Sequence, residues 1–368
     1  MSYLREITLF QFKNYAEKSY SFSQKIIGLT GQNGAGKTNL LDAIHYLCLT
    51  KSYFGRNDLQ AVHIGKEGFS VRGVFEKADQ TNSINCIYRE NGKKEFWIDG
   101  NPIVRNADHI GQYPLIIIAP DDINLITGES RERRAFIDQL IAQLDPVYLT
   151  QLLTYNRLLQ QRNALLKEMA EKRTATNTVL DVIDEQMVLP SMYLFEKRTE
   201  ILHQLIPEAQ QIYQSLASAG TTLDAEKPEL FYTSELQKNS FPLLLSQNRS
   251  RDLFLQRTTK GPHRDDLTCT LQHLPFKQIA SQGQRKSLLF ALKLAALQLL
   301  KWKQSTPPLL LLDDIFEKLD DSRVRQLLKI IAHHNSSQVF LTHTSSEKLK
   351  TCLSDVTTSF EIIEIKAS

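Results

Sequence analysis

The segment 31–38 constrains the fold of this chain more than any other part of its sequence. It fits the phosphate-loop pattern G-x-x-x-x-G-K-[ST], between an apolar stretch of strand length at 25–30 and an amphipathic stretch at 39–50 that predicts a helix. Glycines allow backbone N–H groups to close on phosphate oxygens, and the helix N-terminus adds partial positive charge. The pattern therefore predicts an α/β protein with a phosphate site. Its residues are Gly31, Gln32, Asn33, Gly34, Ala35, Gly36, Lys37 and Thr38.

An apolar strand candidate at 309–312 ends in two acids, Asp313 and Asp314, as expected of the partner of a phosphate loop. Lys37 would reach the β- and γ-phosphates of ATP, and the Thr38 hydroxyl would ligate Mg²⁺. Asp313 would hold the same ion, and Asp314 would polarise the attacking water. Alone, the two acids could equally be a solvated turn, but the phosphate loop favours the metal site.

The segment 281–284 directly precedes a predicted helix and has two interpretations. Ser281 and Gln284 have the spacing of a capping box, in which the two side chains satisfy free N–H groups at the helix start. The same free N–H groups, with those of Gly283, can also bind phosphate. The sequence order favours the second interpretation, because the segment lies about 30 residues before Asp313, where ABC-type ATPases carry their signature.

Length and composition set the wider limits. A chain of 368 residues predicts two domains, or one large domain with an insertion. With 42% hydrophobic and 23% charged residues the composition is that of a globular protein, and a net charge of +3 permits nucleic acid as a partner without requiring it. Four widely spaced cysteines predict neither a zinc site nor a redox pair. No apolar run approaches the about 18 residues of a membrane helix, so we expect a cytoplasmic protein with no membrane partner.

The order of predicted elements indicates an insertion. Strand and helix patterns alternate at both ends of the chain, whereas residues from about 128 onward are helical. One helix is expected to begin at Pro146, after the N-cap Asp145, and to run for roughly 27 residues, or about 40 Å. A second helix follows, and we expect Pro190 to kink or divide it and Pro207 to interrupt it. The ends of the chain would then form one α/β domain that a helical hairpin splits.

Further segments complete a resemblance to a known family. Residues 12–15, 128–138 and 261–267 resemble motifs of the RecF family, which belongs to the SMC-related, ABC-type ATPase heads. Lys13 stands in place of the family's usual Arg, and residues 281–284 stand where ABC proteins have S-G-G-Q. The Asp-Asp pair at 313–314 is as expected of RecF. Residues 317–320 fit the D-loop, and residues 341–343 fit the strand end that carries the switch histidine.

The resemblance implies an α/β fold, an ABC-type P-loop ATPase head whose lobe I has a mixed sheet with helices and whose lobe II is a helical insertion. Residues 1–125 would form the N-terminal part of lobe I, with the Walker A loop. Residues 126–264 would form helical lobe II with a short helical hairpin. Residues 265–368 would carry the signature motif and the C-terminal part of lobe I, with Walker B, D-loop and switch histidine.

The resemblance also assigns site roles. Ser281, Gly283 and Gln284 would contact, in trans, the ATP that Lys37 of a second copy holds. Asp320 would act in the D-loop, Asp314 and His343 in catalysis, and Lys13 and Asn14 would contact the nucleotide. For several residues an ordinary role is also open. His343 could be a surface histidine and Lys13 a solvated lysine; Arg131, Arg133 and Arg134 could contact DNA or a partner, or form salt bridges; and 261–267 could be a structural turn.

The implied function is ATP-dependent DNA binding in recombinational repair, replication maintenance and the SOS response. ATP would drive homodimerisation on DNA at single-strand/double-strand junctions or gaps, to help load recombinase with RecR-like and RecO-like mediators. Slow, weak and DNA-stimulated hydrolysis would drive release. The alternatives are a chromosome organiser, which a helical arm of about 40 Å does not favour, another SMC-like or ABC-type ATPase subunit such as that of a transporter, and a small-molecule kinase. A basic stretch at 249–264 could bind phosphates or be a solvated surface.

Overall fold

The computed structural model describes residues 2–77, 80–174, 176–217, 227–314, 321–333 and 337–366. The chain folds into two compact units. The first unit comprises Met1–Asp122, Gln211–Leu223 and Lys286–Ser368, and the second comprises Ile123–Gln210 and Asp224–Arg285. Within the described ranges, no helix has the length and apolar character needed to cross a membrane.

A five-stranded parallel sheet forms the centre of the first unit, in the order β14-β3-β13-β12-β8. Every residue of β3, β8, β12 and β13 is buried, as expected of parallel strands covered on both faces. The bounds are β3 Ile26–Thr30, β8 Leu115–Ile118, β12 Leu309–Leu312, β13 Val339–His343 and β14 Glu361–Glu364. The helices of the same unit include α1 Lys37–Leu49, α9 Asp321–His333 and α10 Ser346–Ser354.

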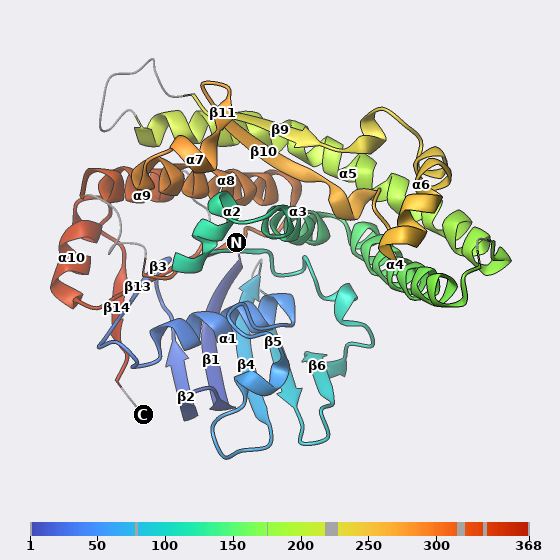
Figure 1. The fold of residues 1–368 in the computed structure, drawn as a ribbon. Coiled ribbons are helices and arrows are strands. Elements are labelled where there is room, and N and C mark those ends of the chain that lie inside the picture. The colour runs from blue at the N-terminus through green and yellow to red at the C-terminus, as the bar shows by residue number, and fades with distance from the viewer. Residues whose placement is uncertain are drawn as a thin grey trace. The chain divides into compact units, whose positions relative to one another are not determined.

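A second, antiparallel sheet of the first unit has the order β2-β1-β4-β5-β6-β7. Helix α1 packs against strands of both sheets, and 11 of its residues are buried (Figure 1). The apolar core of this unit therefore lies around α1, the helix that follows the phosphate loop. The bounds are β1 Ser2–Phe12, β2 Tyr15–Ser21, β4 Phe69–Lys77, β5 Gln80–Tyr88, β6 Lys94–Ile98 and β7 Asn101–Pro102, with 3-10 turns η1 Asp58–Ala61, η2 Asn106–Asp108 and η3 Pro120–Ile123.

The second unit combines helices with a three-stranded antiparallel sheet of order β11-β10-β9. Helices α5 and α8 contribute residues to both units. The helices are α2 Asn124–Thr127, α3 Ser130–Leu144, α4 Pro146–Lys172, α5 Thr178–Ala217, α6 Phe241–Leu255, α7 Phe276–Ile279 and α8 Gln282–Lys303. The strands are β9 Glu229–Thr233, β10 Asp266–Leu271 and β11 Leu274–Pro275, and the 3-10 turns are η4 Glu235–Gln237 and η5 Pro262–Arg264.

Helix α5 differs from the sequence-based expectation, because it continues for 40 residues through both prolines. The expected division at Pro190 and interruption at Pro207 are therefore wrong. A proline inside a helix removes one backbone donor and costs about 3 kcal/mol. Burial of one apolar face of α5 offsets this cost, since Leu180, Met187 and Leu194 are each 0% exposed. Helix α4 has the expected start, with Asp145 accepting hydrogen bonds from the N–H groups of Val147 and Tyr148.

The two units differ from the sequence-based division at two places. Residues 265–285 group with the second unit, because β10 pairs with β9 and packs against α3. Gln211–Leu223 groups with the first unit, although its residues up to Ala217 are the end of helix α5. Residues 265–285 join the second unit because β10 pairs with β9, and the paired residues lie 33 to 41 positions apart in sequence. The composition of neither strand predicts this pairing.

Buried ion pairs hold the helical elements of the second unit together. Arg162 of α4 is 0% exposed, and it donates to Asp184 of α5 at 2.6 Å and to Asp252 of α6 at 2.7 Å. Arg198 of α5 is 2% exposed and donates to Asp138 of α3 and to Asp265. Because removing one partner of such a pair leaves an uncompensated buried charge, these contacts fix the arrangement of the four helices.

Candidate nucleotide-binding site

Three neighbouring parallel strands, β3, β13 and β12, bring the predicted site residues of the first unit to one sheet edge. Thr30, the last residue of β3, is in register with His343, the last residue of β13. Asp313 follows directly on β12, whose Leu312 is in register with Leu341. The carboxyl ends of parallel strands are the usual place for a ligand in such sheets, so the edge itself predicts a site.

The phosphate loop follows β3 and has the backbone that its glycines allow. Gly31, Gly34 and Gly36 have φ values of +147°, +81° and +112°, which residues with a Cβ rarely adopt. Gly36 is the N-cap of α1 and has no side chain to satisfy the first N–H groups of the helix. The free N–H groups at the start of α1 and the positive end of its dipole therefore lie at the end of the loop. Phosphate groups bind at helix N-termini of this kind.

Lys37, the first residue of α1, is 8% exposed. Its Nζ donates to the carbonyl oxygens of Gly31 at 2.7 Å and Gln32 at 3.0 Å. The loop thus holds the ammonium group on its own backbone carbonyls. Since these acceptors carry no net charge, the positive charge of Lys37 is solvated by dipoles and not neutralised by a carboxylate at these two contacts.

Thr38 and Asp313 meet as the sequence predicts. The Thr38 hydroxyl lies 3.0 Å from both carboxylate oxygens of Asp313. The Thr342 hydroxyl donates to the same carboxylate at 2.9 Å. Burial raises the pKa of Asp313, while the hydrogen bonds from Thr342 and Thr38 and the charge of Lys37 act in the opposite direction. Sequence reasoning missed Thr342, although a hydroxyl one residue before the switch histidine was visible in the sequence.

Asp314 and His343 lie beside this cluster. The Asp314 backbone has φ +48°, and its N–H donates to the Thr342 hydroxyl at 2.8 Å. His343 is 9% exposed, so it is not the surface histidine that remained an alternative. Its Nδ1 accepts the N–H of Ser345 at 2.7 Å, which places the proton of the neutral ring on Nε2. Thr342 therefore holds the backbone of Asp314, and Ser345 holds the ring of His343.

Asn14 supports the phosphate loop, and its contact with a nucleotide stays a prediction. Its Nδ2 donates to the Ala35 carbonyl at 3.3 Å, and its Oδ1 accepts the Asn39 side-chain amide at 2.7 Å. Tyr15 donates to the Gly36 carbonyl at 3.0 Å. Residues at the turn between β1 and β2 thus hold the backbone of the phosphate loop. Sequence reasoning did not assign this role, because the role depends on how the strands pair.

Lys13 is not a solvated lysine. Its side chain is 14% exposed and its Nζ lies 2.5 Å from Asp42, a carboxylate of α1 that is 0% exposed. Asp42 also accepts the Ser52 hydroxyl and the Tyr53 N–H, both at 2.6 Å. Sequence reasoning missed Asp42; its place among apolar residues of an amphipathic helix was the signal that could have found it.

The second unit holds the predicted signature residues. The Ser281 N–H donates to the Gln284 side chain at 2.6 Å, and the Gln284 N–H donates to the Ser281 hydroxyl at 3.2 Å. The capping box is therefore present, and Ser281 is exposed while Gly283 is half-buried. A capping box uses the same N–H groups that a phosphate would, so it leaves the trans role as a prediction. The predicted D-loop residue Asp320 lies outside the described residues.

The motif at 261–267 has a structural role in the second unit. Asp265 accepts from Arg198, and Asp266 receives two hydrogen bonds from Arg133, at 2.6 and 3.0 Å. Arg134 donates to the Asp265 carbonyl at 2.7 Å. Of the three arginines at 131–134, Arg133 and Arg134 thus form internal contacts, whereas Arg131 is exposed.

The donors beside the phosphate loop suit a magnesium ion. Mg²⁺ prefers hard oxygen ligands and usually binds through one or two carboxylates together with substrate phosphates and waters. Thr38 and Asp313 supply a hydroxyl and a carboxylate at adjoining positions. The described ranges contain no group of three or more His, Cys, Asp or Glu side chains that could hold a metal ion.

Comparisons with known proteins extend over almost the whole chain. A family model described as the RecF/RecN/SMC N terminal domain matches residues 3–363. The "DNA replication and repair protein RecF" of Flavobacterium johnsoniae is 37% identical over 363 residues, which are 99% of this chain and 100% of that protein. The protein of the same name from Cytophaga hutchinsonii is 38% identical over 346 residues, 94% of this chain and 90% of its own length.

Solved structures match over a similar range. The recombination mediator protein RecF in complex with ATP, described as part of the RecFOR pathway, has a TM-score of 0.88 at 28% identity, covering 100% of this chain and 96% of that one. An Smc head domain from Pyrococcus furiosus has a TM-score of 0.58 at 17% identity, covering 100% of this chain and 94% of that one. The second likeness concerns the fold alone.

Proposed function

The chain belongs to the RecF family of DNA replication and repair proteins and has the SMC-type ATPase head fold, and from this premise we propose that it is an ATP-dependent DNA-binding protein of recombinational repair. ATP binds at the phosphate loop and drives homodimerisation on DNA at single-strand/double-strand junctions or gaps. The dimer helps RecR-like and RecO-like mediators to load recombinase. Slow hydrolysis releases it.

One observation carries the ATP part of this proposal. The Thr38 hydroxyl lies 3.0 Å from the Asp313 carboxylate, across two elements that are 275 positions apart in sequence, at the open N-terminus of α1. A phosphate loop, a metal-side carboxylate and a helix N-terminus at one sheet edge are what a nucleoside triphosphate requires. The RecF relative of known structure is described as holding ATP.

Lys37 contributes by exchanging partners. In the present arrangement its ammonium group is bonded to two loop carbonyls. The β- and γ-phosphates of ATP offer charged acceptors, and hydrogen bonds between charged partners are about twice as strong as those to neutral ones. Lys37 can therefore exchange the two carbonyls for the phosphates, and this exchange breaks no ion pair at these two contacts.

Thr38 and Asp313 would hold Mg²⁺, which supplies neutralisation of phosphate charge when bound. Asp314 orients and polarises the attacking water, with its backbone fixed by Thr342. His343 donates from Nε2 toward the reacting phosphate, since its Nδ1 is occupied by Ser345. A carboxylate on the short side chain of aspartate reaches less far than that of glutamate, so we expect weak, DNA-stimulated turnover.

The signature residues act in trans. Ser281, Gly283 and Gln284 of one copy contact the γ-phosphate of ATP bound at Lys37 of the other, giving a two-fold dimer with two shared sites. A ligand that bridges two copies stabilises the pair by the difference between its affinities for the paired and the separate copies. Hydrolysis removes the shared phosphate, and the pair separates.

The test measures DNA binding and assembly together. Fluorescence anisotropy on a gapped duplex, with no nucleotide, ADP or ATP, is combined with sedimentation of the full chain. Lys37→Met removes the phosphate contact, and Ser281→Arg blocks the trans contact. Lys66→Met, at an exposed position, is the charge-matched control, and Ser281→Ala removes only the cap.

We expect ATP alone to promote both the dimer and DNA binding, and both variants to lose these effects while Lys66→Met keeps them. DNA binding that ignores ATP would contradict the gating. Dimerisation of the Ser281→Arg variant would limit Ser281 to its role as a helix cap.

A further inference from the structure

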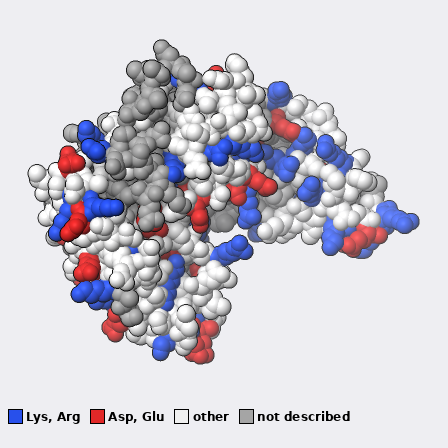
Figure 2. Space-filling view, turned by 60° about the vertical axis from the view of Figure 1, so that its left-hand side comes forward, with Lys and Arg blue, Asp and Glu red and all other residues white. Residues whose placement is uncertain are grey.

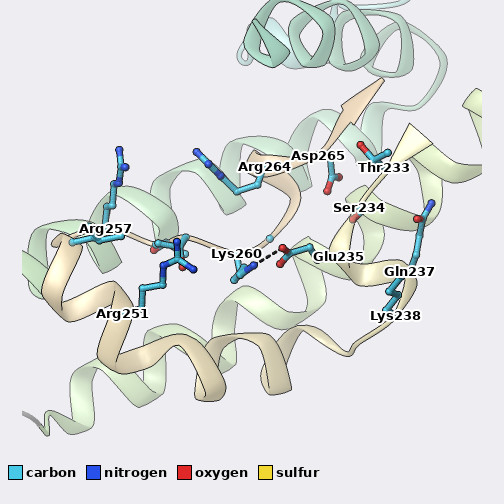
Figure 3. Close-up of a pocket in the computed structure, with 14 residues that line it drawn as sticks. Thr233, Ser234, Glu235, Gln237, Lys238, Arg251, Arg257, Lys260, Arg264 and Asp265 are labelled. Carbon is cyan, nitrogen blue, oxygen red and sulfur yellow. Dashed lines mark hydrogen bonds and ion pairs between the residues drawn. The ribbon is translucent and has the colours of Figure 1, made fainter. Parts of the chain in front are cut away.

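The second unit contains a cavity of about 490 Å³ that none of the roles above uses. Its walls come from the end of β9 and the η4 turn, from the C-terminal half of α6, and from residues 257–265 (Figure 3). Ligand pockets generally measure about 300 to 1,000 Å³, so this cavity can receive a group of the size of a nucleotide.

Three arginines from different segments line the cavity: Arg251 on α6, Arg257 after α6, and Arg264 in η5. All three side chains are exposed, and in the described parts of the chain none forms a salt bridge. In Figure 3 Arg257 and Arg264 extend to the same side of the cavity. Three like charges around one cavity repel one another, and a bound anion would relieve this repulsion.

Of the remaining charged residues of the cavity, Lys238 is exposed and adds to the positive charge, whereas the other three are engaged. Lys260 forms an ion pair with Glu235, drawn as a dashed line in Figure 3. Asp265 accepts from Arg198 and from the Tyr232 hydroxyl. The two carboxylates of the cavity are therefore committed to other cations or donors, and the three arginines give it a positive excess. Figure 2 shows both signs of charge over the face that it draws.

Helix α6 also carries an exposed aromatic ring. Phe254 is 86% exposed and does not itself line the cavity. It lies three residues after Arg251 on α6 and next to Leu255, which lines the cavity, so Arg251, Phe254 and Leu255 share one face of the helix. A solvated phenylalanine gains contact area by stacking on a planar ring. Guanidinium groups bind phosphates, and together they form the combination that holds unpaired nucleotides.

We propose that this cavity binds single-stranded DNA, with backbone phosphates at Arg251, Arg257 and Arg264 and a base stacked on Phe254. The inference rests on the proposed function and deepens it, because it assigns the single-stranded side of the junction to the second unit. A duplex is disfavoured because its base faces are stacked inside and are not available to Phe254. An acidic peptide would use the arginines but would gain little from the aromatic ring.

The experiment compares four full-length variants with the wild type by fluorescence anisotropy. The three DNA substrates are a thymidine oligonucleotide of about 15 nucleotides, a blunt duplex of equal length, and the gapped duplex with ATP. The double variant Arg251→Gln/Arg257→Gln removes two cavity charges. Arg249→Gln is its control on the same helix, since Arg249 is paired with Asp181 and Asp184. Phe254→Ala has Leu243→Ala as control, an apolar residue of α6 that is 43% exposed.

We expect the double variant to lower the slope of log affinity against log salt concentration on the oligonucleotide by about 1.4. Phe254→Ala should weaken oligonucleotide binding by about fivefold or more, and both controls should leave it unchanged. The blunt duplex should respond to none of the variants. Competition by polyglutamate should be weak, and equally weak against wild type and Phe254→Ala.

Three results would overturn the inference. If the cavity variants lose as much affinity for the blunt duplex as for the oligonucleotide, the arginines contact duplex DNA. If Arg249→Gln loses as much affinity as the double variant, the effect is one of net charge. Strong displacement of the oligonucleotide by polyglutamate would favour an acidic protein partner. Wild-type protein that binds no gapped DNA with ATP contradicts the proposed function as well. ATP-dependent binding that none of the cavity variants alters contradicts this inference alone.

Discussion

The buried arginines of the second unit and Lys37 of the first unit are held in different ways. In the second unit Arg162 and Arg198 are almost fully buried and are bonded to carboxylates of neighbouring elements. In the first unit Lys37 is buried nearly as well, but its two hydrogen bonds go to neutral carbonyls of its own loop. A cation matched by buried carboxylates is committed to structure, whereas one held by dipoles stays available to a ligand.

The composition of the chain allows the two units to be followed separately. Both tryptophans, Trp97 and Trp302, lie in the first unit. Tryptophan fluorescence therefore reports unfolding of the first unit, while far-UV circular dichroism is dominated by helices, including α3 to α6 of the second. Damage to one unit can thus be told from damage to the other.

The largest effect is expected for Arg198→Met. The substitution leaves the buried Asp265 and the half-buried Asp138 without their cation, and breaking a buried pair typically costs 3–5 kcal/mol. Urea unfolding followed by circular dichroism should show this loss, and the fluorescence transition should move less. The control is the neighbouring Lys197→Met, because Lys197 is 33% exposed and its pairs should be worth less than about 1 kcal/mol. Equal losses in the two variants would contradict the contrast.

The second prediction concerns pH. Burial lowers the pKa of His263 to about 4, and its Nε2 lies 3.1 Å from the Thr258 carbonyl. Above pH about 6.5 the folded and unfolded states are both neutral. Below it, the unfolded state binds a proton that the folded state excludes until about pH 4. Stability should therefore fall by about 2 kcal/mol between pH 7 and pH 5 from this group alone.

The variant His263→Gln should show a flatter pH profile by circular dichroism at a lower stability at pH 7. Burial also lowers the pKa of His45 in the first unit. A loss of stability on acidification is therefore expected in tryptophan fluorescence too, and His45→Gln should flatten that profile more than the profile seen by circular dichroism. A variant with the same pH slope as the wild type would contradict the assignment.

The third prediction compares two glycines of the phosphate loop. A Cβ at Gly36 would lie 2.7 Å from the Asn14 amide and 2.8 Å from the Tyr15 hydroxyl, at φ +112°. A Cβ at Gly34 would meet nothing within 4 Å, at φ +81°. Gly34→Ala should cost the left-handed backbone strain of about 1–2 kcal/mol, and Gly36→Ala should cost more and weaken ATP binding further. Fluorescence-detected unfolding and ATP titration measure both.

The smallest effect is expected for Ser281→Ala. Loss of the hydroxyl that accepts the Gln284 N–H should cost about 1 kcal/mol, as for other helix caps. Thermal unfolding measures the change, and Ser281→Thr, which retains a capping hydroxyl, should recover most of it. If the alanine variant is as stable as the wild type, the capping box does not contribute to stability.

The sequence predicted those features that depend on neighbouring residues. The phosphate loop, the strand before Asp313 and the start of α4 at Asp145 follow from local pattern, because glycine torsions, apolar runs and caps are set within a few positions. The family and the fold class were also predicted, and the comparisons confirm both. The roles of the individual site residues remain predictions.

Contacts between distant segments could not be predicted where no motif relates the two residues, unlike Thr38 and Asp313. The pairs Lys13–Asp42 and Arg198–Asp265 join residues that no periodicity relates. The continuity of α5 through Pro190 depends on burial against other elements, which outweighs the local propensity. The basic stretch at 249–264 was visible, but only the structure separates the paired Arg249 from the arginines of the cavity.

The strand order of the parallel sheet has a consequence for how the chain is made. Strand β3, which carries the phosphate loop, lies between β14 and β13, and both partners are encoded about 300 residues later. At the usual 5–20 residues per second, β3 leaves the ribosome about 15 to 60 s before either partner. The elements from α2 to α7 are complete earlier. Co-translational folding can therefore begin in the helical segment, while the nucleotide site forms only as synthesis ends.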